Sequence, residues 1–127
     1  MPTILLIEDN EASRDALSRR LERRGYNVVT ASDGEQGVSM AKSENPDILL
    51  MDMNMPVLDG WQAARMIKSN DKTQHLPIIG LTAHAMSGDR EKALAAGCVD
   101  YHTKPVDFAQ LINQIEAVLT VKEARRT

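Results

Sequence analysis

The stretch LLMDMNMPVLDGW, residues 49 to 61, places a carboxylate, Asp52, between a run of apolar residues and a Met-Asn-Met-Pro turn. A short apolar run bounded by turn residues is typical of a strand that is buried on both faces. A carboxylate that ends such a strand lies just beyond the core. The stretch therefore predicts a buried strand that delivers Asp52 to the edge of a sheet.

Four further short apolar runs alternate with longer amphipathic segments, as in repeated βα units around a mostly parallel sheet. The five runs are TILLIE (3 to 8), YNVVTA (26 to 31), DILLM (47 to 51), PIIGLT (77 to 82) and VDYHT (99 to 103). The second and fifth runs contain more polar residues than the others, which places them at the sheet edges. The sequence therefore predicts a doubly wound α/β fold with strand order 2-1-3-4-5.

Capping signals divide the amphipathic segments into helices. The residues that can cap or begin them are Asp9 or Asn10, Asp33, Gly60, a residue after Ser87, and Asp107. We expect the first helix to end near Gly25 and the second near Asn45 and Pro46. The last helix has an apolar stripe at helical spacing, and core packing is the favoured reason for it over a membrane surface or a partner helix.

The length of 127 residues suits one compact domain and is too short for two ordinary ones. We expect a domain over residues 1–121 and a short, frayed C-terminal tail over 122–127. A net charge of -3 and an aromatic content of 3% disfavour direct nucleic-acid binding. The lone Cys98 excludes a disulfide framework, and the N-terminus resembles neither a signal peptide nor a membrane span. These features predict a soluble, cytoplasmic protein.

Polar side chains stand at the carboxyl ends of four of the five expected strands. They are Glu8 and Asp9, Asp52, Thr82, and Lys104. In open α/β sheets these ends meet at one edge, and ligands bind where the winding direction reverses, here between strands one and three. Each residue alone could be a helix cap or a surface residue. A single site accounts for all five, so we expect them to converge.

Three carboxylates in one crevice require a cation among them. Each pair at about 4 Å repels by about 4 kcal/mol at an effective dielectric constant near 20. Mg²⁺ fits, because it binds few carboxylates and leaves positions open for phosphate oxygens. Zinc is disfavoured, since His75, His84 and His102 lack ligand spacing. A carboxylate beside Mg²⁺, a hydroxyl and an ammonium is a plausible nucleophile for phosphoryl transfer.

The ordered set of motifs resembles the response-regulator receiver domain of two-component signalling, from about Thr3 to about Leu119. The motifs are Glu8-Asp9, the D-x-x-M-P-x-x-D-G segment from Asp52 to Gly60, Thr82-Ala83 and Lys104-Pro105. The resemblance implies a flavodoxin-like (βα)5 fold. The chain also looks similar to stand-alone, DivK-like regulators and to receivers of hybrid kinases, and a cis peptide before Pro105 is common in this family.

The resemblance implies that Asp52 accepts a phosphoryl group from a phosphohistidine. It further implies that Asp9, Asp52 and the backbone carbonyl of Asn54 bind Mg²⁺, and that Mn²⁺ can substitute for it. Glu8 would act on the metal through a bound water. The implied partners are a sensor histidine kinase, a histidine phosphotransfer protein or both, and a downstream protein target. The protein would be a monomer or a phosphorylation-dependent dimer.

The resemblance also implies roles for residues around the phosphoryl group. Thr82 and Lys104 would hold its oxygens, and the small Ala83 would leave access to them. Tyr101 matches the family's switch aromatic, which turns inward as Thr82 moves. Phosphorylation would then change the face formed by helix four, strand five and helix five. We expect Met86, Tyr101 and His102 on or near that face.

Asn54 and His84, two residues beyond Asp52 and Thr82, resemble the positions that tune hydrolysis of the aspartyl phosphate. His84 fits a solvent-exposed loop residue equally well. The resemblance thus favours a signalling module with weak self-catalysed phosphorylation and dephosphorylation over a true enzyme.

Three other classes fit less well. A haloacid-dehalogenase-like phosphatase resembles D-x-D at the end of the first strand, whereas the nucleophile candidate here, Asp52, ends the third. A flavodoxin-type carrier must bind the FMN phosphate after strand one, where Glu8, Asp9 and Glu11 would repel it. A phosphorylation-independent scaffold usually lacks one of the key residues, and none is missing.

Overall fold

The structure is a computed structural model that describes residues 2–83 and 89–126, with side chains described over 2–83 and 91–121. Strands and helices alternate along the described chain. In order they are β1 (Thr3–Ile7), α1 (Glu11–Arg23), β2 (Asn27–Ala31), α2 (Gly34–Ser43), β3 (Ile48–Asp52), α3 (Gly60–Lys68), β4 (Ile78–Thr82), α4 (Asp89–Ala95), β5 (Asp100–Thr103) and α5 (Phe108–Arg126). His84 and Met86 lie outside the described residues.

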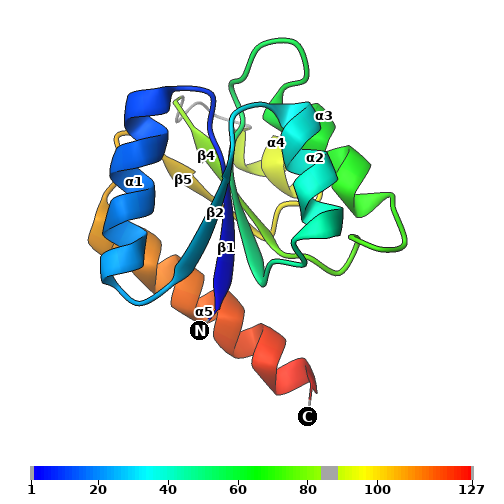
Figure 1. The fold of residues 1–127 in the computed structure, drawn as a ribbon. Helices are drawn as coiled ribbons and strands as arrows, with labels where there is room; N and C mark the ends of the chain where they lie inside the picture. Colours follow the sequence, from blue (N-terminus) through cyan, green and yellow to red (C-terminus); the bar gives the residue numbers. More distant parts are fainter. Residues whose placement is uncertain (1, 84–88, 127) are drawn as a thin grey trace.

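The strands form one parallel sheet in the order β2-β1-β3-β4-β5, as predicted. Helices α1 and α5 cover one face of this sheet, and α2, α3 and α4 cover the other (Figure 1). Because successive side chains of a strand point to opposite faces, each central strand supplies both layers of the core. Leu50 of β3, for example, packs on the α1 and α5 side, whereas Leu49 and Met51 pack on the other side.

The burial of the strands explains why edge and central strands differ in sequence. Every residue of β3 and β4 is buried, and the alternation of apolar and polar residues is lost there. Strand β2 has two exposed residues, and β5 has one buried residue, His102. The prediction that the second and fifth strands form the edges is therefore confirmed.

Side chains cap the helices that lead away from the carboxyl edge of the sheet. Asn10, rather than Asp9, caps α1, because its Oδ1 accepts the N–H of Ser13 at 2.9 Å. Asp59 forms a reciprocal capping box with Gln62 at the start of α3. With Asn10 as the cap, the exposed carboxylate of Asp9 is not used to begin the helix.

The last helix differs from the prediction. The frayed tail expected from residue 122 onward is helical to Arg126, so α5 has 19 residues. The reason is composition, because neither glycine nor proline interrupts α5, and Lys, Glu, Ala and Arg are strong helix formers. Over the described part of the chain, none of the helices has the length and apolar character needed to cross a membrane.

Candidate functional site

The carboxylates at the ends of β1 and β3 lie together at the carboxyl edge of the sheet. One oxygen from each of Glu8, Asp9 and Asp52 lies within 4.8 Å of the others. Glu8 and Asp52 are buried, whereas Asp9 is exposed. Strands β1 and β3 are neighbours in the sheet, so the residue that follows β1 and the last residue of β3 must meet. The cluster forms where the winding direction of the sheet reverses.

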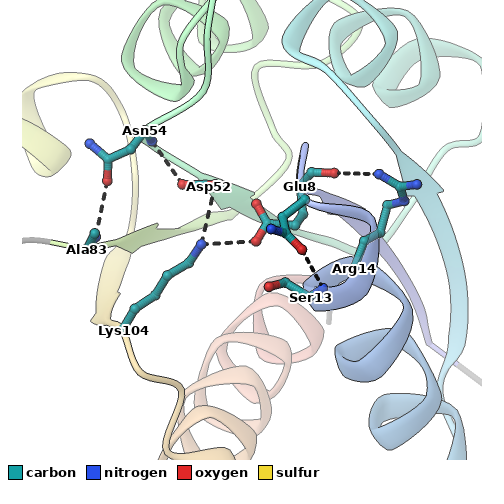
Figure 2. Close-up of polar contacts among 8 residues, drawn as sticks. Glu8, Ser13, Arg14, Asp52, Asn54, Ala83 and Lys104 are labelled. Carbon is teal, nitrogen blue, oxygen red and sulfur yellow. Dashed lines mark hydrogen bonds and ion pairs between the residues drawn. The ribbon is translucent and has the colours of Figure 1, made fainter.

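Lys104, which follows the edge strand β5, brings one positive charge to this cluster. Its Nζ lies 3.0 Å from Glu8 Oε1 and 3.3 Å from Asp52 Oδ2 (Figure 2). Its backbone N–H donates to the carbonyl of Thr82 at 2.7 Å, which continues the pairing of β5 with β4. The peptide bond between Lys104 and Pro105 is cis, as expected. The end of β5 thus directs the ammonium toward β1 and β3.

The loop after Asp52 folds back on the site. The N–H of Asn54 donates to Asp52 Oδ1 at 2.9 Å, and Asn54 Oδ1 accepts the N–H of Ala83 at 3.1 Å (Figure 2). The side chain of Asn54 therefore joins the loop after β3 to the end of β4. A Cβ on Gly60 would lie 2.5 Å from the carbonyl oxygen of Asp52, so α3 begins in close contact with the strand end.

The charges of this site are unbalanced. Burial raises the pKa of Glu8 to about 7, and Asp52 adds to the effect while Lys104 partly offsets it. Burial also pushes the pKa of Asp52 upward, but hydrogen bonds with Glu8, Asn54 and Lys104 outweigh it and hold that pKa below its usual value. Burial lowers the pKa of Lys104, and the two carboxylates more than reverse this. Asp52 is therefore ionised at neutral pH, whereas Glu8, with a pKa of about 7, is only partly ionised.

One oxygen of Glu8 needs a further partner. Glu8 Oε2 is buried and has no hydrogen-bond partner among the described residues. An ionised carboxylate oxygen in this position lacks a donor, whereas a proton on Glu8 allows a hydrogen bond to Asp52. A cation or a water bound to it would serve the same purpose. The oxygen-only donor set of Glu8, Asp9 and Asp52 suits a hard divalent cation such as Mg²⁺.

The remaining residues with expected roles lie around this cluster. Thr82 is buried at the end of β4, and Ala83 is exposed directly after it. Tyr101 is half-buried on β5 and packs against the core layer beneath α2, α3 and α4. The structure therefore brings Asp52, Thr82 and Lys104 to the ends of three neighbouring strands. The roles assigned to these residues remain predictions.

His102 and Arg14 make contacts that the sequence does not predict. His102, expected on or near the face of α4, β5 and α5, lines a hollow over β5 and α5, and only 3% of it is exposed. Side chains alternate along a strand, and Tyr101 packs on the α4 side, so its neighbour His102 points toward α5. Arg14 was not identified, although its Nη1 donates to the backbone carbonyl of Glu8 at 3.0 Å (Figure 2). A basic residue in the first turns of α1 gives no sequence signal for such a contact.

Comparisons of this chain with known proteins all point to one family. The model of the response regulator receiver domain matches residues 4–116. The polar-differentiation response regulator DivK of Brucella anthropi is 31% identical over 117 residues, which cover 92% of this chain and 95% of that protein. The transcriptional regulatory protein AfsQ1 of Streptomyces coelicolor is 40% identical over 127 residues, 100% of this chain but 55% of that protein.

Solved structures agree with these sequence matches. The receiver domain of a sensor histidine kinase from Pseudomonas aeruginosa, with a magnesium ion coordinated in its active-site cleft, is 39% identical with a TM-score of 0.86. The match covers 94% of this chain and 98% of that one. The chemotaxis protein CheY4 of Vibrio cholerae is 26% identical with a TM-score of 0.87, over 93% of this chain and 98% of that one.

Proposed function

This chain belongs to the response regulator receiver domain family, and from that premise we propose that Asp52 accepts a phosphoryl group from a phosphohistidine in a Mg²⁺-dependent reaction. The observation that carries the proposal is the position of Asp52. It ends a buried strand, contacts an ammonium at 3.3 Å, and has a lowered pKa. It is therefore ionised and available as a nucleophile at neutral pH.

In the proposed reaction an oxygen of Asp52 forms a bond to phosphorus while the bond from phosphorus to the donor imidazole breaks. The imidazole leaves with the electron pair of that bond and takes up a proton. Lys104 moves from its carboxylate partners to an oxygen of the phosphoryl group. The hydroxyl of Thr82 holds a second oxygen, and Ala83 leaves room for the group at the exposed rim.

In this proposal Asp9, Asp52 and the backbone carbonyl of Asn54 would hold the metal, with Mn²⁺ able to substitute for Mg²⁺. Glu8 would act on the metal through a water. When bound, the ion neutralises charge on the carboxylates and on the transferred phosphoryl group. Two observations support it, namely the unpartnered Oε2 of Glu8 and the clustered carboxylates. The magnesium ion in the similar Pseudomonas aeruginosa receiver domain adds to this support.

We infer that phosphorylation is read out on the face of α4, β5 and α5. Thr82 moves inward as its hydroxyl makes new contacts with the phosphoryl group. The half-buried ring of Tyr101 then turns inward as well. A hollow of about 560 Å³ lies over β5 and α5, which gives a protein partner a surface to bind. Its lining residues are Asp100, Tyr101, His102, Thr103, Gln110 and Gln114. Asn54 and His84 tune the lifetime of the phosphoryl group.

The expected partners follow from the same proposal. A sensor histidine kinase or a histidine phosphotransfer protein donates the phosphoryl group, and a downstream protein binds the phosphorylated form. The protein works as a cytoplasmic signalling module, a monomer or a phosphorylation-dependent dimer, whose own phosphorylation and dephosphorylation are slow. It does not turn over a substrate.

A small phosphodonor tests the proposal. Incubation with phosphoramidate and Mg²⁺ should add the mass of one phosphoryl group to the intact protein, and EDTA should prevent the addition. Asp52→Asn should remain unlabelled, whereas the control Asp71→Asn, at an exposed loop position, should be labelled like the wild type. Failure of the wild type to be labelled by phosphoramidate and by a panel of phosphorylated kinases would reject the proposal. Sustained turnover of a phosphomonoester would indicate a phosphatase instead.

A further inference from the structure

His102 is a buried polar residue, two positions before Lys104, and it takes no part in the proposed phosphoryl transfer. Both of its ring nitrogens are paired. The backbone N–H of Asp107 lies 3.1 Å from Nε2, and Gln114 Oε1 lies 2.7 Å from Nδ1. A backbone N–H can only donate, so Nε2 must be the unprotonated acceptor. The proton therefore sits on Nδ1, which donates to Gln114, and the tautomer of His102 is fixed.

Gln114 extends this pairing from α5 back to β5. Its Nε2 donates to Asp100 Oδ2 and to the backbone carbonyl of Tyr101, each at 2.9 Å. Asp100 Oδ1 in turn accepts the N–H of Tyr101 at 2.8 Å. Every hydrogen-bonding atom of the His102 ring and of the Gln114 amide thus has a partner of the correct kind. We call His102, Gln114, Asp100 and Asp107 the β5–α5 clamp.

The clamp closes the two ends of the segment that carries Lys104. His102 lies at the start of this segment and, through Nε2, binds the backbone of Asp107 at its end. Between these two residues the chain leaves β5, passes through the cis peptide at Pro105 and enters α5. The Nζ of Lys104 must reach across to Glu8 and Asp52 from within this closed segment. The direction of the Lys104 side chain therefore depends on the position of the 102–107 segment.

An apolar side chain would satisfy burial at position 102, but it would not bind Asp107. A fully paired buried network specifies one arrangement of the backbone, because any other arrangement leaves polar groups without partners. We propose that His102, supported by Gln114, is a positioning residue that holds the 102–107 segment so that Lys104 points at the phosphoacceptor. The inference rests on the proposed function of Asp52 and Lys104, and it adds a residue to that site.

A set of His102 variants tests the proposal. His102→Leu removes both hydrogen bonds, whereas His102→Gln keeps an acceptor at the place of Nε2. We expect His102→Leu to slow labelling of Asp52 by phosphoramidate about tenfold at saturating Mg²⁺. The Mg²⁺ dissociation constant, followed by the fluorescence of the single tryptophan Trp61, should not rise, because Lys104 is not a metal ligand and, once misdirected, no longer competes for Glu8 and Asp52. His102→Gln should recover most of the labelling rate.

A double-mutant cycle separates positioning from general stability. In a Lys104→Ala background, His102→Leu should have little further effect on the labelling rate, because the ammonium that it positions is gone. An equal loss in both backgrounds would overturn the proposal, as would a wild-type rate for His102→Leu. Gln114→Ala, at a half-buried position, replaces His102→Leu in the cycle if the latter does not fold.

A measurement that needs no phosphorylation keeps this test distinct from that of the proposed function. An ammonium held between two carboxylates exchanges its protons slowly, so the side-chain nitrogen of Lys104 should give an NMR signal in the isotope-labelled protein. We expect His102→Leu to lose this signal and His102→Gln to keep it. If the wild type is not phosphorylated, the proposed function fails, and this signal still decides whether His102 positions Lys104. Retention of the signal in His102→Leu overturns the inference.

Discussion

The ammonium of Lys104 lies 3.3 Å from Asp52 Oδ2, and it comes from the end of β5, whereas Asp9 follows β1 on the other side of β3. It is thus placed to contact a group transferred to Asp52. Removal of one such charged donor from a phosphoryl-transfer site costs roughly 10²-fold in rate. Lys104→Ala should therefore slow labelling by phosphoramidate by about two orders of magnitude.

The same substitution should have the opposite effect on metal binding. Lys104 competes with a bound cation for Glu8 and Asp52, so its removal should tighten Mg²⁺ binding several-fold. Lys72→Ala, at an exposed loop position, is the matched control for the change in net charge. Weaker Mg²⁺ binding in Lys104→Ala than in Lys72→Ala would mean that the ammonium organises the carboxylates instead of competing for them.

Glu8 makes the stability of the metal-free protein depend on pH. Burial, with Asp52 adding to it, raises the pKa of Glu8 from 4.5 to about 7. Between these pH values the folded state binds a proton that the unfolded chain has released, so the free energy of unfolding should fall as the pH rises. Asp52 acts the other way at lower pH. Its pKa is lowered from 3.8, so its contribution is present above 3.8 and is lost as the pH falls through the lowered value.

Urea unfolding in EDTA from about pH 5 to about pH 7 measures this effect. We expect a loss of roughly 1 to 3 kcal/mol over this range in the wild type. Glu8→Gln, which cannot ionise, should give a flatter profile and greater stability near pH 7. Mg²⁺ should bind with release of the proton, so its apparent affinity should rise with pH over the same range. An unchanged profile in Glu8→Gln would assign the pH dependence to other groups.

Gly60 gives a prediction that runs against helix propensity. It begins α3, where Ala should be the better helix former by roughly 0.5 to 1 kcal/mol. A Cβ there would lie 2.5 Å from both the carbonyl oxygen of Asp52 and the Cα of Met53, which are backbone atoms. Gly60→Ala must therefore displace either α3 or the end of β3. We expect a loss of about 1 to 3 kcal/mol in urea unfolding, and slower phosphorylation of Asp52.

Ser39→Ala, at an exposed position within α2, is the control for propensity alone. It should leave stability unchanged or raise it slightly. A stabilised Gly60→Ala variant with a normal phosphorylation rate would mean that α3 can move away from Asp52 without cost.

The fold and the clustering of the site residues follow from features that a sequence carries locally. Strand order could be predicted because apolar runs distinguish buried strands from edge strands, as β3 and β2 show. Glu8, Asp9 and Asp52 come together because parallel strands present the same ends at one edge. Their convergence needs no knowledge of individual side-chain contacts.

The features that the sequence could not supply depend on which side chains become neighbours in space. Side chains alternate along β5, so His102 faces α5. Its partner Gln114 belongs to that helix, and its partner Asp107 directly precedes the helix. The contact of Arg14 with the carbonyl of Glu8 likewise joins α1 to the end of β1. Asp9 and Asn10 were equally good caps by residue type, and only the geometry of the turn separates them.

Val57 and Asn45 are the non-glycine residues with positive φ in the part of the chain that the structure describes, at 65° and 46°. Asn adopts this conformation readily, whereas a β-branched residue is strained in it. Val57 is fully exposed in the loop between β3 and α3, so packing does not compensate for the strain. Val57→Asn should therefore raise the free energy of unfolding by about 1 kcal/mol.

The reciprocal change at Asn45 is the control, because it introduces the strain that the first change removes. Asn45 is exposed just after the end of α2, and Asn45→Val should lower the free energy of unfolding by about 1 kcal/mol. Urea unfolding of both variants and of the double variant measures the two effects, which should add because the two sites lie in different loops. Equal signs for the two single variants would show that β-propensity or the unfolded chain, and not backbone strain, determines the cost at these positions. The more stable Val57→Asn variant can also be compared with the wild type in its phosphorylation rate. A slower rate with a kinase, together with a normal rate with phosphoramidate, would mean that the exposed valine contacts the protein donor.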